Sequence, residues 1–265
     1  MYSWTPFPHI GDYIYDAARV KKNWAKLHAG DAEPLPTDTQ LLEAWALFHS
    51  GEFQKAAEHG LSLANNGLTA GLTVANKATC IYANYLEANE STKLALFMEV
   101  ALRAEQQAQD ASISAESLPN AYYWQAYALG RYSQGISVAK ALAQGLGGKI
   151  KDALEKTIHL QPKHADAHIA LGTFHAEVID KVGSLIASMT YGAKKDASFN
   201  FFQEALRINT NSAIAMIEQA NGWVMLEGEK RLAEATKLYE IASAIHPLDA
   251  MERLDIDMAK NELTD

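Results

Sequence analysis

The chain has 265 residues, of which 48% are hydrophobic and only 7 are proline, so it can bury a large core and differs from disordered proteins. Its 23 basic and 32 acidic residues give a formal net charge of -9, which disfavours binding to a phosphate backbone. No run of lysine and arginine is longer than two residues. We therefore expect no nucleic-acid partner.

Other features missing from the sequence narrow the class of protein further. Cys80 is the only cysteine, which excludes an intramolecular disulfide and a zinc site built from several cysteines. Residues 1–8 lack the basic and apolar regions of a signal peptide. No window approaches the roughly eighteen consecutive apolar residues that span a bilayer. We therefore expect a cytoplasmic protein without membrane insertion.

Apolar residues recur at intervals of three and four almost throughout the chain, which predicts an all-α protein. A first helical stripe follows Asp12, the expected cap, and runs to Leu27. Residues 34–36 contain two prolines and form the clearest linker. We predict an N-terminal helix and linker over residues 1–36 and a helical-repeat domain over residues 37–265.

Two further helix starts can be placed from capping residues. Thr37 or Asp38 is expected to cap a helix that runs through His49. Ser91 or Thr92 is expected to cap a later helix in the same way.

One helical-hairpin pattern recurs in the second half of the chain. Its copies end at residues 157–162, 205–210 and 242–247, each with a small residue, an apolar residue three positions on and a proline or turn residue two further on. The pair Leu171-Gly172 suits the first helix of a hairpin, because glycine lets the second helix approach closely. The pattern resembles the tetratricopeptide repeat. We therefore predict a tetratricopeptide-like, right-handed α–α superhelix of helical hairpins.

The best copy of this hairpin is expanded. Its second-helix signature, at residues 201–206, comes about fourteen residues later than in the usual 34-residue unit, and the insertion contains residues 182–192. An expanded hairpin of this kind resembles the regulator of microtubule dynamics family, in which a similar apolar insertion precedes the corresponding helix. The aromatic segment that ends at residues 128–132, followed by residues 145–150, is similar to the periplasmic tetratricopeptide subunit of tripartite transporters. Neither family supplies a catalytic motif.

Stacked helical hairpins form a curved surface whose usual role is binding. We therefore predict a non-enzymatic interaction or scaffold protein that binds a protein or peptide partner through its concave groove, or associates with its own copies. Polar residues within first helices are expected to line this groove, and a plain solvated face is the alternative interpretation. The groove candidates are Lys77, Asn84, Ile169, Thr173 and Glu177.

A small-molecule carrier is the alternative function. Ligand pockets are mostly apolar, and both the aromatic segment and the inserted segment are rich in large apolar residues. Packing between neighbouring helices is the other interpretation of the aromatic residues. The pocket candidates are Tyr123, Trp124, Tyr127, Leu185, Ile186 and Met189.

Three histidines are the only residues with a pattern that could suggest metal chemistry. His164, His168 and His175 share one helical face, but the first and last lie roughly 16 Å apart along the axis, too far for one ion. Only His164 and His168 could share a metal, and packing, capping or a solvated groove is the alternative that we favour. Cys80 is expected to be a buried, unreactive thiol. We expect no catalytic residue, metal or cofactor.

Overall fold

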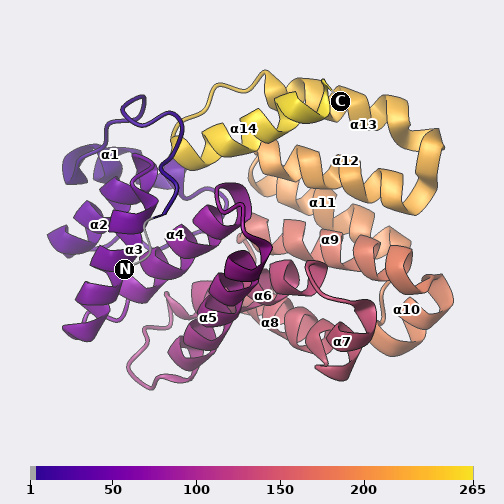
Figure 1. Ribbon diagram of the computed structural model, residues 1–265, viewed down its shortest axis with the longest axis horizontal. Helices are drawn as coiled ribbons and strands as arrows, with labels where there is room; N and C mark the ends of the chain where they lie inside the picture. Colours follow the sequence, from indigo (N-terminus) through magenta and orange to yellow (C-terminus); the bar gives the residue numbers. More distant parts are fainter. Residues whose placement is uncertain (1–3, 265) are drawn as a thin grey trace. The chain divides into compact units, whose positions relative to one another are not determined.

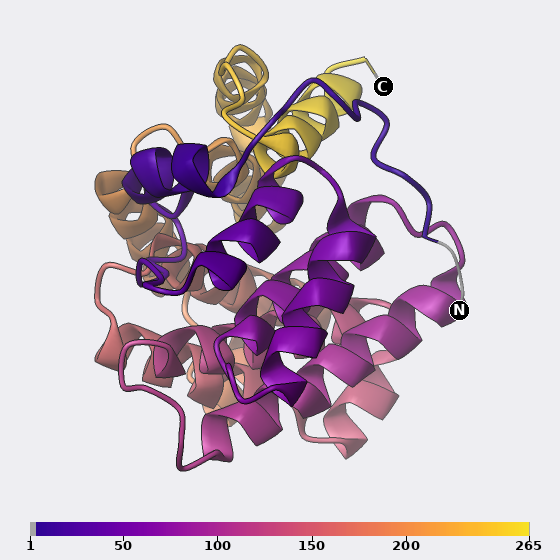
Figure 2. The same cartoon turned by 90° about the vertical axis from the view of Figure 1, so that its left-hand side faces the viewer.

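A computed structural model of the chain describes residues 4–264. These residues form α-helices connected by turns, with one short 3-10 helix (η1, Gly228–Arg231) and no strand (Figures 1 and 2). The prediction of an all-α protein is therefore confirmed over the described residues.

The helices gather in two compact units, which we describe separately. Unit 1 comprises the chain up to His28, Glu33–Leu160 and Leu248–Met251. Unit 2 comprises Ala29–Ala32, Gln161–Pro247 and the chain from Glu252 onward. The predicted boundary at residue 36 lies between α1 (Ala17–Leu27) and α2 (Thr39–His49), two helices that pack against each other in unit 1.

Unit 1 is a stack of helices in which α4 occupies the interior. Helix α3 packs on α4, α5 on α6, and α6 on α8, while α4 also contacts α2, α5 and α6. Because α4 is covered on several sides, even its polar residues are mostly buried. After α1 and α2, the helices of unit 1 are α3 (Phe53–Asn65), α4 (Gly71–Tyr85), α5 (Glu90–Gln109), α6 (Leu118–Gln134), α7 (Val138–Ala143) and α8 (Leu146–Leu160).

Side-chain caps set where several helices of unit 1 begin. Asp38 accepts hydrogen bonds from the backbone at the start of α2, as predicted. The predicted cap of the first helix is wrong, because α1 begins at Ala17 and the Asp16 carboxylate accepts the Arg19 N–H at 2.7 Å. Helix α5 is capped by Asn89, ahead of the two residues predicted for that role.

Two glycines allow α3 and α4 to cross in backbone contact. A Cβ atom added at Gly60 would lie 2.5 Å from the carbonyl oxygen of Gly71 and 3.0 Å from the backbone nitrogen of Ala75. A Cβ atom at Gly71 would in turn overlap the carbonyl oxygen of Gly60. The close crossing of these helices therefore depends on the absence of both side chains.

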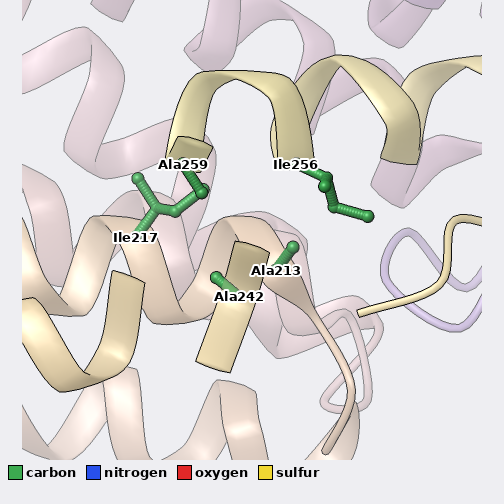
Figure 3. Close-up of a cluster of buried hydrophobic side chains, with 5 residues drawn as sticks. All are labelled: Ala213, Ile217, Ala242, Ile256 and Ala259. Carbon is green, nitrogen blue, oxygen red and sulfur yellow. The ribbon is translucent and has the colours of Figure 1, made fainter. Parts of the chain in front are cut away.

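Unit 2 consists of helical hairpins joined by a shared core. Helix α9 packs on α11, α12 packs on α13, and the first helices of the two hairpins, α9 and α12, pack against each other. A cluster of buried apolar side chains joins α12 and α13 to α14 (Figure 3). The members of this cluster are Ala213, Ile217, Ala242, Ile256 and Ala259. The helices of unit 2 are α9 (Ala165–Val182), α10 (Ser184–Tyr191), α11 (Lys195–Ile208), α12 (Ala213–Glu227), α13 (Leu232–Ser243) and most of α14 (Ala250–Glu262).

The close approach of two helices that was predicted at Gly172 is confirmed by the contact of this residue with α11. A Cβ atom at Gly172 would lie 2.9 Å from the ring of Phe202, which is fully buried. Gly222 on α12 faces the same ring, and a Cβ atom there would lie 2.6 Å from it. Phe202 therefore packs between two glycines on neighbouring helices, and this contact fixes the spacing of α9, α11 and α12.

The inserted segment forms the short helix α10, which follows α9 and precedes α11 in the sequence and packs on α9. Only Ala187 of this helix is buried. Leu185, Ile186 and Met189 are 73%, 57% and 81% exposed. The insertion therefore presents apolar side chains to solvent within unit 2.

Candidate functional site

The predicted groove residues Thr173 and Glu177 lie on the face that α9 shares with α12. The Thr173 hydroxyl donates a hydrogen bond of 3.0 Å to the carboxylate of Glu218 on α12. One turn further along α9, the carboxylate of Glu177 lies 3.6 Å from the ammonium group of Lys181. Both residues are half-buried. The first helices of two hairpins therefore bring polar, mainly acidic side chains together on one face.

The other three groove candidates are placed differently. Lys77 is only 2% exposed, and its ammonium group lies 5.6 Å from the ring centre of Trp45 and 5.2 Å from that of Phe48. Ile169 is buried in the core with Phe202. Asn84 is half-buried on α4. Lys77 and Ile169 are thus covered by the chain's own residues, so Thr173 and Glu177 are the candidates that share a partly open face.

The aromatic residues of α6 pack mainly on one another. Tyr123 and Trp124 are buried, and their ring centres lie 4.9 Å apart in an edge-to-face arrangement. Tyr127 contacts both rings. All three ring contacts are made within α6. The indole nitrogen of Trp124 is buried and has no hydrogen-bond partner among the described residues.

The pocket candidates fall into the two units. The aromatic residues belong to unit 1, whereas Leu185, Ile186 and Met189 belong to α10 in unit 2 and are exposed.

The three histidines of the α9 region each make a structural contact within unit 2. The ring Nδ1 of His164 accepts the Ala167 N–H at 3.1 Å and caps α9, as the capping interpretation predicted. The Nε2 of His168 donates to the carbonyl oxygen of Pro162 at 3.1 Å. His175 accepts the Lys194 N–H at 3.2 Å, and its ring stacks on Phe201.

Cys80 is buried in the interior of unit 1, as predicted. Burial raises the pKa of the Cys80 thiol far above its ordinary value, because no water solvates the thiolate, and this outweighs the favourable charges of Arg103 and Arg131. We expect Ellman's reagent at pH 8 to leave the native thiol unmodified and to react with one thiol per chain in 6 M guanidinium chloride. Rapid reaction of the folded protein would contradict the buried position.

A polar cluster that the sequence does not suggest lies in the interior of unit 1. The ring Nδ1 of His49 donates to the Asp249 carboxylate at 2.6 Å, and both side chains are almost fully buried. On the other side of the ring, the Nε2 atoms of His49 and His28 lie 3.3 Å apart, so one donates and the other accepts. The ring of His28 stacks on Trp24 at 3.9 Å. This chain of contacts fastens residues 248–251 to α1 and α2.

Across the part of the chain that the structure describes, no group of three or more histidine, cysteine, aspartate or glutamate side chains is arranged to hold a metal ion. Among the described helices, none is long and apolar enough to cross a membrane. Comparison with known proteins finds no family model and no curated protein that matches this chain.

Proposed function

We propose that this protein is a non-enzymatic helical-repeat interaction protein, with a tetratricopeptide-like right-handed superhelix of hairpins that binds a protein or peptide in its concave groove. The hydrogen bond between Thr173 and Glu218 carries the proposal, because it places polar groups of two neighbouring first helices on one face. First helices line the concave surface in repeat proteins of this kind.

The charge of this face suggests the chemistry of the partner. Glu177 and Glu218 contribute two carboxylates to this face and Lys181, paired with Glu177, contributes one ammonium group, while the chain as a whole carries a net charge of -9. An acidic surface attracts a basic partner over distances of about 10 Å at moderate ionic strength. We therefore propose a basic peptide segment as the ligand of the α9–α12 face, and a second copy of the chain as the alternative partner.

A pull-down from the source cell tests the proposal. The bait proteins are the wild type, the double variant Thr173→Ala/Glu177→Ala, and a control, Glu204→Ala/Arg207→Ala, which removes an exposed ion pair on α11 of the same unit. We expect at least one partner to be recovered equally by the wild type and the control, and about tenfold less by the double variant. Equal recovery of every partner by all three baits, each shown to be folded, would remove this face as the binding site.

The carrier function remains the second candidate, and the Trp124 indole N–H favours it. This donor is buried without a partner among the residues that the structure describes, which costs free energy unless another molecule accepts the hydrogen bond. Native mass spectrometry of freshly purified protein distinguishes the two functions. A small molecule that co-purifies with the wild type and is lost from Trp124→Phe would favour the carrier.

A further inference from the structure

Residues 4–7, ahead of α1, form neither a helix nor a turn, and they contact α3 and α4 of unit 1. We call residues 4–8 the strap. The strap contains no helix, a turn begins only at its last residue, and Thr5, Pro6 and Pro8 are exposed. It is therefore held by Trp4 and Phe7, two aromatic side chains three positions apart.

Trp4 is bound by both its backbone and its ring. Its N–H donates to the side-chain oxygen of Gln54 on α3 at 3.0 Å. Its ring stacks on that of Tyr82 on α4, with ring centres 4.1 Å apart and planes 13° from parallel. The Tyr82 hydroxyl accepts the Thr5 N–H at 3.4 Å and donates to the buried carboxylate of Glu87 at 2.7 Å. The glutamate thereby orients the hydroxyl toward the strap.

Phe7 packs against the turn between α2 and α3. Its side chain is 2% exposed and contacts the ring of Phe53 at 6.0 Å. The Phe7 ring lies directly against the backbone of Gly51, because a Cβ atom there would overlap the ring. The backbone of Gly51 also has a φ of +85°, which favours glycine. The turn therefore accommodates an aromatic ring because it has glycine at position 51.

These contacts are those of a bound peptide. The backbone hydrogen bonds from Trp4 and Thr5 both end on side chains of the body, and the two aromatic anchors pack against Tyr82 and Gly51. Aromatic anchors of this kind contribute most of the affinity of many interfaces.

We propose that the surface formed by Gln54, Tyr82 and Gly51 is a peptide-binding site that the strap occupies as an internal competitor. Its external ligand is an extended segment of a partner protein with the spacing Trp-x-x-Phe. This site shares no residue with the α9–α12 face, so it extends the proposed interaction function without depending on the groove.

Competition by the strap determines the expected affinities. A tethered segment has an effective concentration on the order of millimolar, so it opposes any ligand of equal intrinsic affinity. A partner segment must therefore bind more tightly than the strap, or bind when the strap is released. Weakening the strap while leaving the site intact should reveal the site to a peptide added in solution.

The probe is a synthetic peptide with the sequence of residues 1–10, labelled with fluorescein at its C-terminus. Fluorescence anisotropy measures its binding to the full-length wild type and to full-length Trp4→Ala/Phe7→Ala. We expect the double variant to bind the peptide at least tenfold more tightly than the wild type does. A control peptide with alanine in place of both aromatic residues should bind neither protein.

Circular dichroism first shows that each protein is folded, and Trp4→Ala alone replaces the double variant if loss of the buried Phe7 prevents folding. Adding Tyr82→Leu to the strap variant should reduce peptide binding at least tenfold, since it removes the stacking surface and the hydroxyl. A folded strap variant that binds both peptides equally would overturn the proposal. A wild-type dimer that Trp4→Ala dissociates, without peptide binding, would also overturn it in favour of strap exchange between copies.

Discussion

Replacing Gly60 with alanine is expected to lower the free energy of unfolding by about 3 kcal/mol. The added Cβ atom would lie 2.5 Å from the Gly71 carbonyl oxygen and 3.0 Å from the Ala75 nitrogen. Both atoms belong to the α4 backbone, so no side-chain rotation relieves the overlap, and the two helices must move apart. Urea unfolding followed by circular dichroism measures the loss.

Gly130→Ala is the matched control for this prediction. Gly130 lies within α6, and apart from its chain neighbours and the surrounding helix backbone no described heavy atom lies within 4 Å of the position that a Cβ atom would take. Alanine there should stabilise the protein by about 0.5 kcal/mol or more, because it favours the helix over the unfolded chain. A Gly60→Ala variant as stable as Gly130→Ala would show that α3 and α4 do not cross in backbone contact.

Asp249→Ala is expected to cost about 3 kcal/mol of stability, since it leaves the Nδ1–H of His49 buried without its acceptor. The pair is 2.6 Å apart and almost completely shielded from water. For comparison, Asp257→Ala on α14 removes a partly exposed ion pair with Arg253 and should cost less than about 1 kcal/mol.

A double-mutant cycle with His49→Leu measures the interaction energy between His49 and Asp249 separately from the other effects of replacing the aspartate. Once His49 is replaced, the further loss caused by Asp249→Ala should fall by about 2 kcal/mol, because the donor that it leaves unpaired is gone. Chemical denaturation of the wild type, both single variants and the double variant supplies the four free energies. Strictly additive losses would mean that the two side chains do not act together in the folded protein.

The sequence predicts the elements of this fold better than its polar interior. Helical periodicity, the Asp38 cap and the close approach at Gly172 depend on residues near one another in the chain or on the absence of a side chain, so the pattern reveals them. The placement of Lys77 could not be obtained in this way. A spacing of seven puts it on one face with Asn84, but that face of α4 is covered by other helices, and the ammonium group lies over aromatic rings.

The candidate sites were also predicted only in part, because their contacts join residues far apart in the sequence. Thr173 and Glu177 can be assigned to one face of a helix, whereas the Glu218 carboxylate comes from a second helix 45 residues later. His49 and Asp249 are separated by 200 positions and carry no local signal of their contact. The strap was also missed, because an irregular segment has no periodicity, although its paired aromatic residues are visible in the sequence.

The contact between His49 and Asp249 has a consequence for the order in which the chain folds. Unit 1 includes residues 248–251, which follow nearly all of unit 2 in the sequence. During synthesis, α1–α8 therefore leave the ribosome long before Asp249 does. Until then, His49 lacks the carboxylate that accepts its hydrogen bond in the folded protein. Closing so large a loop is entropically costly and slows folding. We therefore expect the last step in the folding of unit 1 to be the docking of residues 248–251, which are synthesised after the rest of that unit.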